Sequence, residues 1–422
     1  MSQQKKQWGA IIVMIALFAM IAFVTNLCTP MATIIKNQGE ISNVLAQIGN
    51  YGNFVAYLVM GIPAGMLIAK FGYKRTALIG LVVGIVGILI QWYSGQLDAQ
   101  ENLGLVFTVY LVGAFIAGLC MCILNCVVNP MLNLLGGGGN KGNQLIQIGG
   151  VFNSSAAVAC YILMGALIAD ATKAKIADAT PALMIALAIF VVAFIVISFT
   201  KIEEPKQAPV QLSLIGGALK HRHFALGALA IFLYMGIEVG VPNFVQQYLV
   251  ADGIPAATVG LLVAVYWFMM LIGRFVGAGI GSKVSSRAMI TTVSSATILL
   301  VLFGMFAPTD IIVNFPGVDW GKLELIWQPI PVGIFAFLLV GLCTSVMWGA
   351  IFNMAVEGLG KYTAIASGIF MTMVFGCAVM MAIQGAVADF TDYVTSFWVV
   401  VFCAAYLLFY ALVGSRVSKR EE

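Results

Sequence analysis

The sequence has little charge for its length. Only 9% of its 422 residues are Asp, Glu, Lys or Arg, whereas 61% are hydrophobic. Soluble globular domains carry roughly 25% charged residues. The composition therefore excludes a water-soluble protein. The small net charge of +4 gives no indication of nucleic-acid binding.

The residue patterns of catalytic and metal sites are also missing. Both histidines, His221 and His223, lie in a polar connector, and the eight cysteines lie singly or without histidines in apolar stretches. The glycine run at 136–139 is not followed by the Lys-Ser or Lys-Thr of a phosphate-binding loop. The sequence therefore predicts no enzyme, no cofactor and no metal site.

The chain instead contains twelve apolar stretches, each at least 22 residues long, separated by short charged connectors. About 20 helical residues cross the hydrocarbon core of a bilayer, and backbone groups in that core must be hydrogen-bonded internally. We expect an all-α polytopic membrane protein with twelve transmembrane helices. The first stretch, from Trp8, is too long for a signal peptide, and we expect an uncleaved helix.

The charges in the connectors predict the orientation. An even number of crossings puts both termini on one side, and that side then holds 16 of the 21 Lys and Arg residues. Basic loops stay in the cytoplasm. The sequence thus predicts a multi-pass inner-membrane protein, monomeric in the bilayer, with both termini cytoplasmic.

The chain divides into two halves that resemble each other. The longest polar connector predicts a bundle of six helices at residues 1–200, a cytoplasmic linker at 201–222 and a second bundle of six at 223–422. The tripeptide Gly118-Leu119-Cys120 is repeated at Gly341-Leu342-Cys343, and the segment 165–170 resembles the segment 385–389. Parallel repeats of this kind are typical of major facilitator transporters.

One connector supports that resemblance. Residues 65–75 are similar to the loop motif of the major facilitator superfamily, Gly-x-x-x-Asp-Arg-x-Gly-Arg-Arg, although Ala69 replaces the aspartate. The resemblance implies a gating or structural role for the motif residues, and we expect the same of the intramembrane arginine of the eighth span. These residues are Gly65, Lys70, Gly72, Lys74, Arg75 and Arg274.

Further segments resemble the fucose–galactose–glucose transporter family. They are 61–65, Asn129-Pro130, Phe152-Asn153-Ser154, 234–239, Tyr266-Trp267, 273–275 and 358–363. The resemblance implies transport of a sugar by alternating access. It does not extend to the family's two proton-linked carboxylates, because Thr29 and Asn125 occupy those positions.

Only two ionisable residues lie deep inside the apolar stretches, Glu238 and Arg274. A charge at that depth is functional or paired. Glu238 is the candidate for proton coupling, and a structural or substrate-binding hydrogen bond is the alternative. For Arg274, nearer the cytoplasm, we expect hydrogen bonds to carbonyl groups of the C-terminal half rather than an ion pair with Glu238.

Neutral polar side chains predict the substrate. Asn125, Asn129 and Asn133 share one helix face, and Asn243, Gln246 and Gln247 cluster in the seventh span. Carboxamides both donate and accept hydrogen bonds, as sugar hydroxyls do, and hydrogen bonds between helices are the competing explanation. The predicted substrate contacts are Asn26, Asn125, Asn129, Gln147, Glu238, Tyr266, Trp267 and Trp348.

The sequence therefore predicts a secondary transporter for a neutral monosaccharide or a related sugar. Proton symport, sodium coupling and uncoupled uniport remain open. A permease or exporter of a nucleoside, peptide or drug is the first alternative, and a membrane receptor the second.

Overall fold

The computed structural model describes residues 7–36, 41–136, 139–168, 174–202, 204, 212–280, 284–319, 324–359 and 362–417. The helices of the first half are α1 (Trp8–Asn26), α2 (Cys28–Lys36), α3 (Asn43–Ala46), α4 (Ile48–Ser94), α5 (Ala99–Leu135), α6 (Gly139–Leu167) and α7 (Thr180–Phe199). Those that follow are α8 (Ile215–Leu219), α9 (Arg222–Ala251), α10 (Ala256–Ile280), α11 (Ser286–Phe306), α12 (Val332–Val356), α13 (Thr363–Thr372), α14 (Gly376–Phe390), α15 (Tyr393–Ser396) and α16 (Trp398–Phe409). Short 3-10 turns lie at Ile176–Ala179, Leu212–Leu214 and Met373–Phe375, and a π-helical turn at Tyr410–Gly414.

These helices make twelve crossings. Eleven described segments are long and apolar enough to span a membrane, and one of them is the 47-residue α4. At about 1.5 Å per residue α4 is far too long for a single crossing. Gly72 breaks it with a φ of 78°, a backbone conformation that glycine adopts readily.

The packing of α4 against α5 shows that its two parts run in opposite directions. Before Gly72, Gly49 lies against Tyr110 and Gly52 against Ala114, so this part runs parallel to α5. After Gly72, Gly80 lies against Ile123 and Gly87 against Ala117, so the order is reversed. The two parts of α4 are therefore the second and third crossings, and the predicted twelve-helix fold is confirmed.

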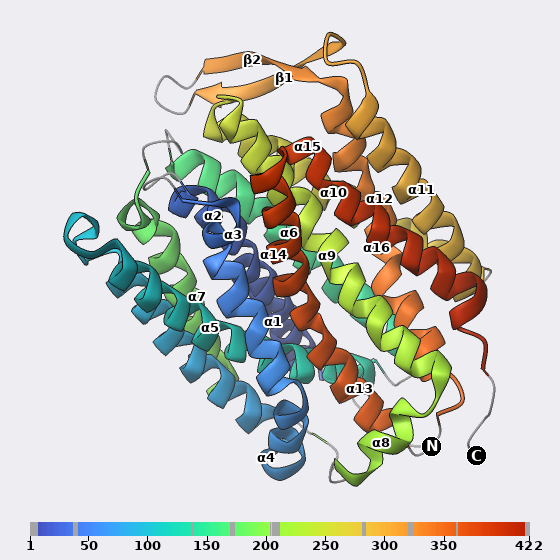
Figure 1. Cartoon of the computed structure of the whole chain (residues 1–422). Coiled ribbons are helices and arrows are strands. Elements are labelled where there is room, and N and C mark those ends of the chain that lie inside the picture. The colour runs from blue at the N-terminus through green and yellow to red at the C-terminus, as the bar shows by residue number, and fades with distance from the viewer. Residues whose placement is uncertain are drawn as a thin grey trace.

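The helices form two six-helix bundles (Figure 1). Helices α1 to α7 pack together in the first bundle, and α9 to α16 pack together in the second. The chain begins and ends at the same end of the molecule, here called the termini end. The opposite end carries a β-hairpin and is called the hairpin end.

The hairpin is the part of the fold that the all-α prediction missed. Strands β1 (Ile312–Asp319) and β2 (Glu324–Pro331) pair antiparallel, with Ile312 opposite Pro331, and join α11 to α12. Strand β2 alternates exposed and partly buried side chains over most of its length. Prolines and a glycine inside the strands hid this alternation in the sequence.

Glycines at repeat-related positions allow the closest helix packing in each bundle. A Cβ atom at Gly118 of α5 would overlap the Asn53 carbonyl oxygen of α4, and one at Gly341 of α12 would overlap the Tyr266 carbonyl oxygen of α10. Small residues let membrane helices approach in this way. The two positions belong to the same element of the internal repeat, so the duplication has a physical basis in packing.

We expect Gly118→Ala to lower the thermal stability of the purified protein, because the added methyl group must push α4 and α5 apart. Overpacking of this kind typically costs about 1–3 kcal/mol. The matched control is Gly9→Ala in α1, where nothing lies within 4 Å of the position that the methyl group would occupy. An unchanged melting temperature for Gly118→Ala would contradict the close packing of α4 and α5.

Candidate functional site

The two ionisable residues predicted inside the membrane lie at the interface of the two bundles. Glu238 in the middle of α9 is partly exposed and interacts electrostatically with Arg274 of α10. The Nη1 atom of Arg274 donates a hydrogen bond to the Gly150 carbonyl of α6. This corrects the expectation that Arg274 would bond carbonyl groups of its own half. The side chain is long enough to cross the interface, and the absence of a Cβ at Gly150 gives it access.

Tyrosines surround Glu238 in the second bundle. The Tyr266 hydroxyl donates to the Glu238 carbonyl oxygen at 3.0 Å and lies 3.2 Å from Thr344 Oγ1. Tyr234 interacts with the Glu238 carboxyl group, and its hydroxyl donates a hydrogen bond to the Thr344 carbonyl oxygen at 3.3 Å. Tyr266 is fully buried. In this conformation it holds the α9 backbone in place beside the carboxyl group.

The first bundle contributes amides. Asn125 of α5 donates to the Tyr57 hydroxyl at 3.0 Å and to the Met121 carbonyl at 3.1 Å. Asn129 donates to the Asn125 carbonyl at 3.2 Å. Both side chains are partly exposed. Their NH₂ groups bond the protein, and within the described residues we find no donor to their Oδ1 atoms.

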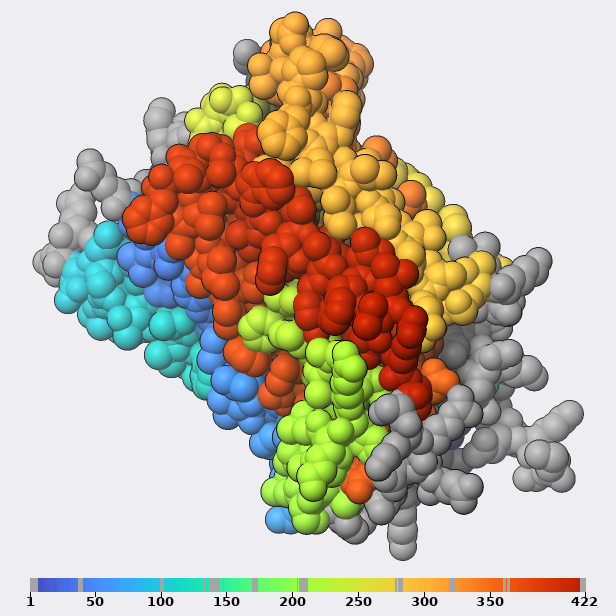
Figure 2. Space-filling model, turned by 45° about the vertical axis from the view of Figure 1, so that its right-hand side comes forward, coloured from blue at the N-terminus to red at the C-terminus, as the bar shows by residue number. Residues whose placement is uncertain are grey.

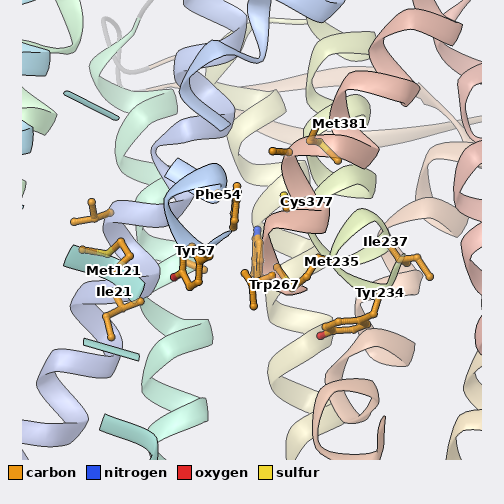
Figure 3. Close-up of a cluster of buried hydrophobic side chains, with 14 of the residues drawn as sticks. Ile21, Phe54, Tyr57, Met121, Tyr234, Met235, Ile237, Trp267, Cys377 and Met381 are labelled. Atoms are coloured by element: carbon orange, nitrogen blue, oxygen red, sulfur yellow. The ribbon is translucent and has the colours of Figure 1, made fainter. Parts of the chain in front are cut away.

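Aromatic rings line the same level of the interface. Figure 3 shows Tyr57 and Phe54 of the first bundle facing Trp267 and Met235 of the second. Trp267 is buried and its Nε1 atom has no hydrogen-bond partner among the residues that the structure describes. Trp348 of α12 is partly exposed and packs on Tyr234, with ring centroids 6.2 Å apart. The rings offer flat apolar surfaces beside the amides and the carboxyl group.

Two further predicted contacts belong to the first bundle. Asn26 is buried and donates to the Ala22 carbonyl one turn earlier in α1, at 2.8 Å. The side chain of Gln147 lies outside the described part of the chain. Among described residues no three His, Cys, Asp or Glu side chains gather in a metal-binding group.

Carboxamides join the two bundles nearer the hairpin end. Gln47 and Asn243 exchange two hydrogen bonds, of 3.2 and 2.7 Å, across the interface. Gln247 donates to Asn243 at 2.7 Å, and Asn50 donates to Gln47 at 2.6 Å. We call these four residues the amide lock. All four are buried.

A second layer lies outside the amide lock at the hairpin end. The Asp389 carboxylate accepts hydrogen bonds from the backbone N–H groups of Asn43 and Val44, at 2.7 and 3.1 Å. Tyr393 donates to Asn43 Oδ1 at 2.7 Å, and Lys36 reaches both side chains. The hairpin end is therefore closed in this conformation.

The sequence predicted Asn243, Gln246 and Gln247 as a polar cluster, with substrate binding and hydrogen bonds between helices as the two explanations. In this conformation Asn243 and Gln247 belong to the amide lock, and Gln246 donates to Thr33 of α2 at 3.2 Å. Gln47, Asn50 and Asp389 were not predicted as functional residues. Gln47 and Asn50 had only a polar side chain near the start of an apolar stretch as a signal, whereas Asp389 also ends a repeated segment.

Comparison with known proteins agrees with this architecture. Residues 11–382 match the family model described as Major Facilitator Superfamily. The chain belongs to the major facilitator superfamily. Proteins of this fold are transporters and not enzymes.

The similar proteins named as transporters cover the chain from end to end. The Brucella abortus (strain 9-941) glucose/galactose transporter is 28% identical over 98% of this chain and 96% of its own length. The Escherichia coli K12 L-fucose-proton symporter is 21% identical over 96% of this chain and 92% of its own length. A crystal structure of the Escherichia coli fucose:proton symporter superposes with a TM-score of 0.69 at 20% identity, covering 98% of this chain and 100% of the other. A crystal structure of a nucleoside transporter superposes with a TM-score of 0.66 at 13% identity, covering 97% of this chain and 100% of the other.

The superfamily loop motif has an altered network in this chain. Glu204, from the connector after α7, accepts hydrogen bonds from the backbone N–H groups of Tyr73 and Lys74. Lys74 Nζ donates to the Ser198 and Thr200 carbonyls, at 3.0 and 2.8 Å. An acid at a helix start and a base at a helix end are both favourable. Although Ala69 has replaced the motif aspartate, a carboxylate still anchors the turn.

The other motif residues lie at the same surface. Gly72 supplies the turn itself. Lys70 and Arg75 are exposed, with Lys70 Nζ 5.2 Å from the centroid of the Phe71 ring. Gly65 is partly exposed within α4. The described contacts of the motif stay within the first bundle and its following connector.

We expect Asn243→Ala to open the hairpin end, because it removes the hydrogen bonds across the interface and leaves Gln47 and Gln247 with unpaired buried groups. The reporter is a cysteine introduced at Ala32, which is fully buried near that end. In the Asn243→Ala background this cysteine should react with a membrane-impermeant maleimide on the order of 5- to 10-fold faster than with the amide lock intact, as expected for the loss of one or two hydrogen bonds.

Asn314→Ala is the matched control, because it removes an exposed amide from the hairpin. Labelling is measured against the parent chain with its eight native cysteines. Equal labelling rates in the Asn243→Ala and Asn314→Ala backgrounds would show that the amide lock does not hold this end closed.

Proposed function

We propose that the protein transports a neutral monosaccharide, a hexose or a closely related sugar, by alternating access. The observation that carries this proposal is that Asn125 and Asn129 are partly exposed amides, and that the partly exposed ring of Trp348 packs on Tyr234 next to Glu238. Amides match sugar hydroxyls, and an aromatic ring covers the apolar C–H face of a sugar. The glucose, galactose and fucose transporters that resemble the chain over nearly its full length support this choice.

The predicted contacts divide into two roles. Asn125, Asn129, Glu238 and Trp348 are partly exposed and are proposed to touch the sugar. Tyr266 supports α9 beside Glu238. The Nε1 donor of Trp267, which has no hydrogen-bond partner among the described residues, is proposed to bind a sugar hydroxyl once the bundles move. Asn26 and Gln147 remain proposed contacts from the first bundle. A strongly anionic sugar phosphate fits poorly, because Arg274 is the single cation at this depth in the described chain.

The proposed location is the bacterial inner membrane, with the termini end in the cytoplasm. The excess of basic residues on the connectors at that end supports this orientation. The structure in hand would then be closed toward the outside. We further propose that the protein works as a monomer, since each chain of this superfamily holds its own site between its two halves.

Counterflow into proteoliposomes tests the substrate. We expect exchange of labelled glucose or galactose by the wild type and a KM raised on the order of 2- to 10-fold by Asn125→Ala, the value of one hydrogen bond. The matched control is Asn102→Ala, because Asn102 caps the start of the α5 crossing far from the site. Exchange of sugar phosphates or nucleosides, with no exchange of neutral sugars, would refute the proposal.

We propose Glu238 as the proton-coupling residue. Its carboxyl group lies at mid-depth on the bundle interface, where it can be exposed to each side in turn, and Arg274 and Tyr234 are its neighbours. Thr29 and Asn125 replace the two acids of the resembling symporter, so within the described spans Glu238 is the remaining acid at this level.

An inward proton gradient should drive sugar accumulation by the wild type, whereas Glu238→Gln should keep counterflow and lose accumulation, because the amide cannot take up a proton. Glu324→Gln, which changes an exposed acid of β2, should behave like the wild type. Accumulation driven by a sodium gradient, or unchanged proton-driven accumulation in Glu238→Gln, would exclude Glu238 as the coupling group.

A further inference from the structure

An apolar groove crosses the seam between the two bundles on the outer face of the molecule. Its volume is about 330 Å³. It is bordered by Ile62 of α4 in the first bundle, by Ile369 and Met373 in and after α13, by Leu229 of α9, and by Leu219 of α8. Figure 1 shows α8, α9 and α13 at the front of the molecule near the termini end. Figure 2 shows the start of α9 meeting α13 and α4 on one outer face.

The lining of the groove rejects polar ligands. Of its described lining residues Thr372 alone has a polar side chain, and its hydroxyl donates to the Gly368 carbonyl at 3.0 Å. A sugar or an ion would lose its hydrogen bonds to water in the groove and gain none. The occupant must therefore be apolar along the length of the groove.

The depth of the groove matches one leaflet of the bilayer. From Arg222 at the start of α9 to Leu229 the helix rises about 10 Å, and half of the hydrocarbon core measures roughly 15 Å. Leu229 and Leu219 are 41% and 45% exposed, as expected for side chains that face lipid. At this depth the molecules that surround the protein are phospholipid acyl chains.

The mouth of the groove is basic. Lys220 and Arg222 are both exposed and lie on either side of His221, between Leu219 of the lining and the first turn of α9. Basic residues at a membrane surface attract anionic headgroups. An acyl chain in the groove would place its headgroup phosphate near these two cations.

We propose that the groove binds one anionic phospholipid, with an acyl chain between α4, α9 and α13 and its phosphate at Lys220 and Arg222. The lipid would contact both bundles, because Ile62 faces Gly368 across the seam and Gly61 lies against Thr372. It would thereby link the movement of the bundles to the composition of the membrane. This site is separate from the sugar site and does not depend on it.

Native mass spectrometry of the purified protein, titrated with phosphatidylglycerol or with phosphatidylcholine of the same chains, tests the proposal. We expect one phosphatidylglycerol to bind more tightly than phosphatidylcholine. The double variant Lys220→Gln, Arg222→Gln should lower the affinity for phosphatidylglycerol on the order of 30-fold, since each basic residue contributes about fivefold to that affinity. The control is Lys201→Gln, Arg287→Gln, which removes two exposed charges elsewhere at the termini end.

A second pair of variants tests the acyl-chain part of the site. Ala225→Phe should fill the groove and weaken binding of phosphatidylglycerol, whereas Val192→Phe adds the same ring to an exposed face of α7 (58% exposed) and should have no effect. Equal binding of both lipids, or phosphatidylglycerol binding that responds to the charges but not to Ala225→Phe, would overturn the site. An unchanged melting temperature and elution volume of the purified Ala225→Phe protein would show that the variant is folded.

Discussion

The structure depends on one constraint: inside a membrane, a polar group without a partner is costly, and water is not there to supply one. A transporter must nevertheless keep polar groups at mid-depth and separate its two halves during each cycle. In the amide lock this chain meets both demands with neutral groups. Gln47 and Asn243 pair across the bundle interface as carboxamides, which are less costly to separate and rehydrate than an ion pair buried at the same place.

Two kinds of polar side chain follow from the same constraint. Asn26, Asn125 and Asn129 each donate to a carbonyl one turn earlier in their own helix. Such bonds survive any movement of one bundle against the other, because both partners move together. The bonds of Asn243, Gln246 and Arg274 instead reach the opposite bundle. These bonds must break when the bundles rearrange, so they determine how stable the present conformation is.

Most of the fold was predictable from the sequence. Hydrocarbon selects helices of a fixed length, which predicts the twelve crossings, and the polar connector and the internal repeat predict the two bundles. The sequence did not predict the β-hairpin, since Pro316, Gly317 and Pro329 obscured its alternation. It predicted Glu238 and Asn125 near one another, because both are polar exceptions in apolar stretches. It assigned the wrong half to the partner of Arg274. For Asn243, the hydrogen bond between helices that it kept as the competing explanation is present. Helical spacing fixes which side chains share a face, but it does not determine which other helix that face meets.

The asymmetry between the two ends explains why the loss of the motif aspartate is tolerated. At the hairpin end, Asp389 of the second bundle caps backbone groups of the first, so a charge contributes directly to closure there. At the termini end, Glu204 and Lys74 form their hydrogen bonds within the first bundle and its connector. Those contacts stabilise the turn at Gly72 in every conformation and do not oppose separation of the bundles. In this conformation, therefore, Arg274 with Gly150 carries a polar connection between the bundles on the termini side of the site, next to Glu238, the proposed coupling residue.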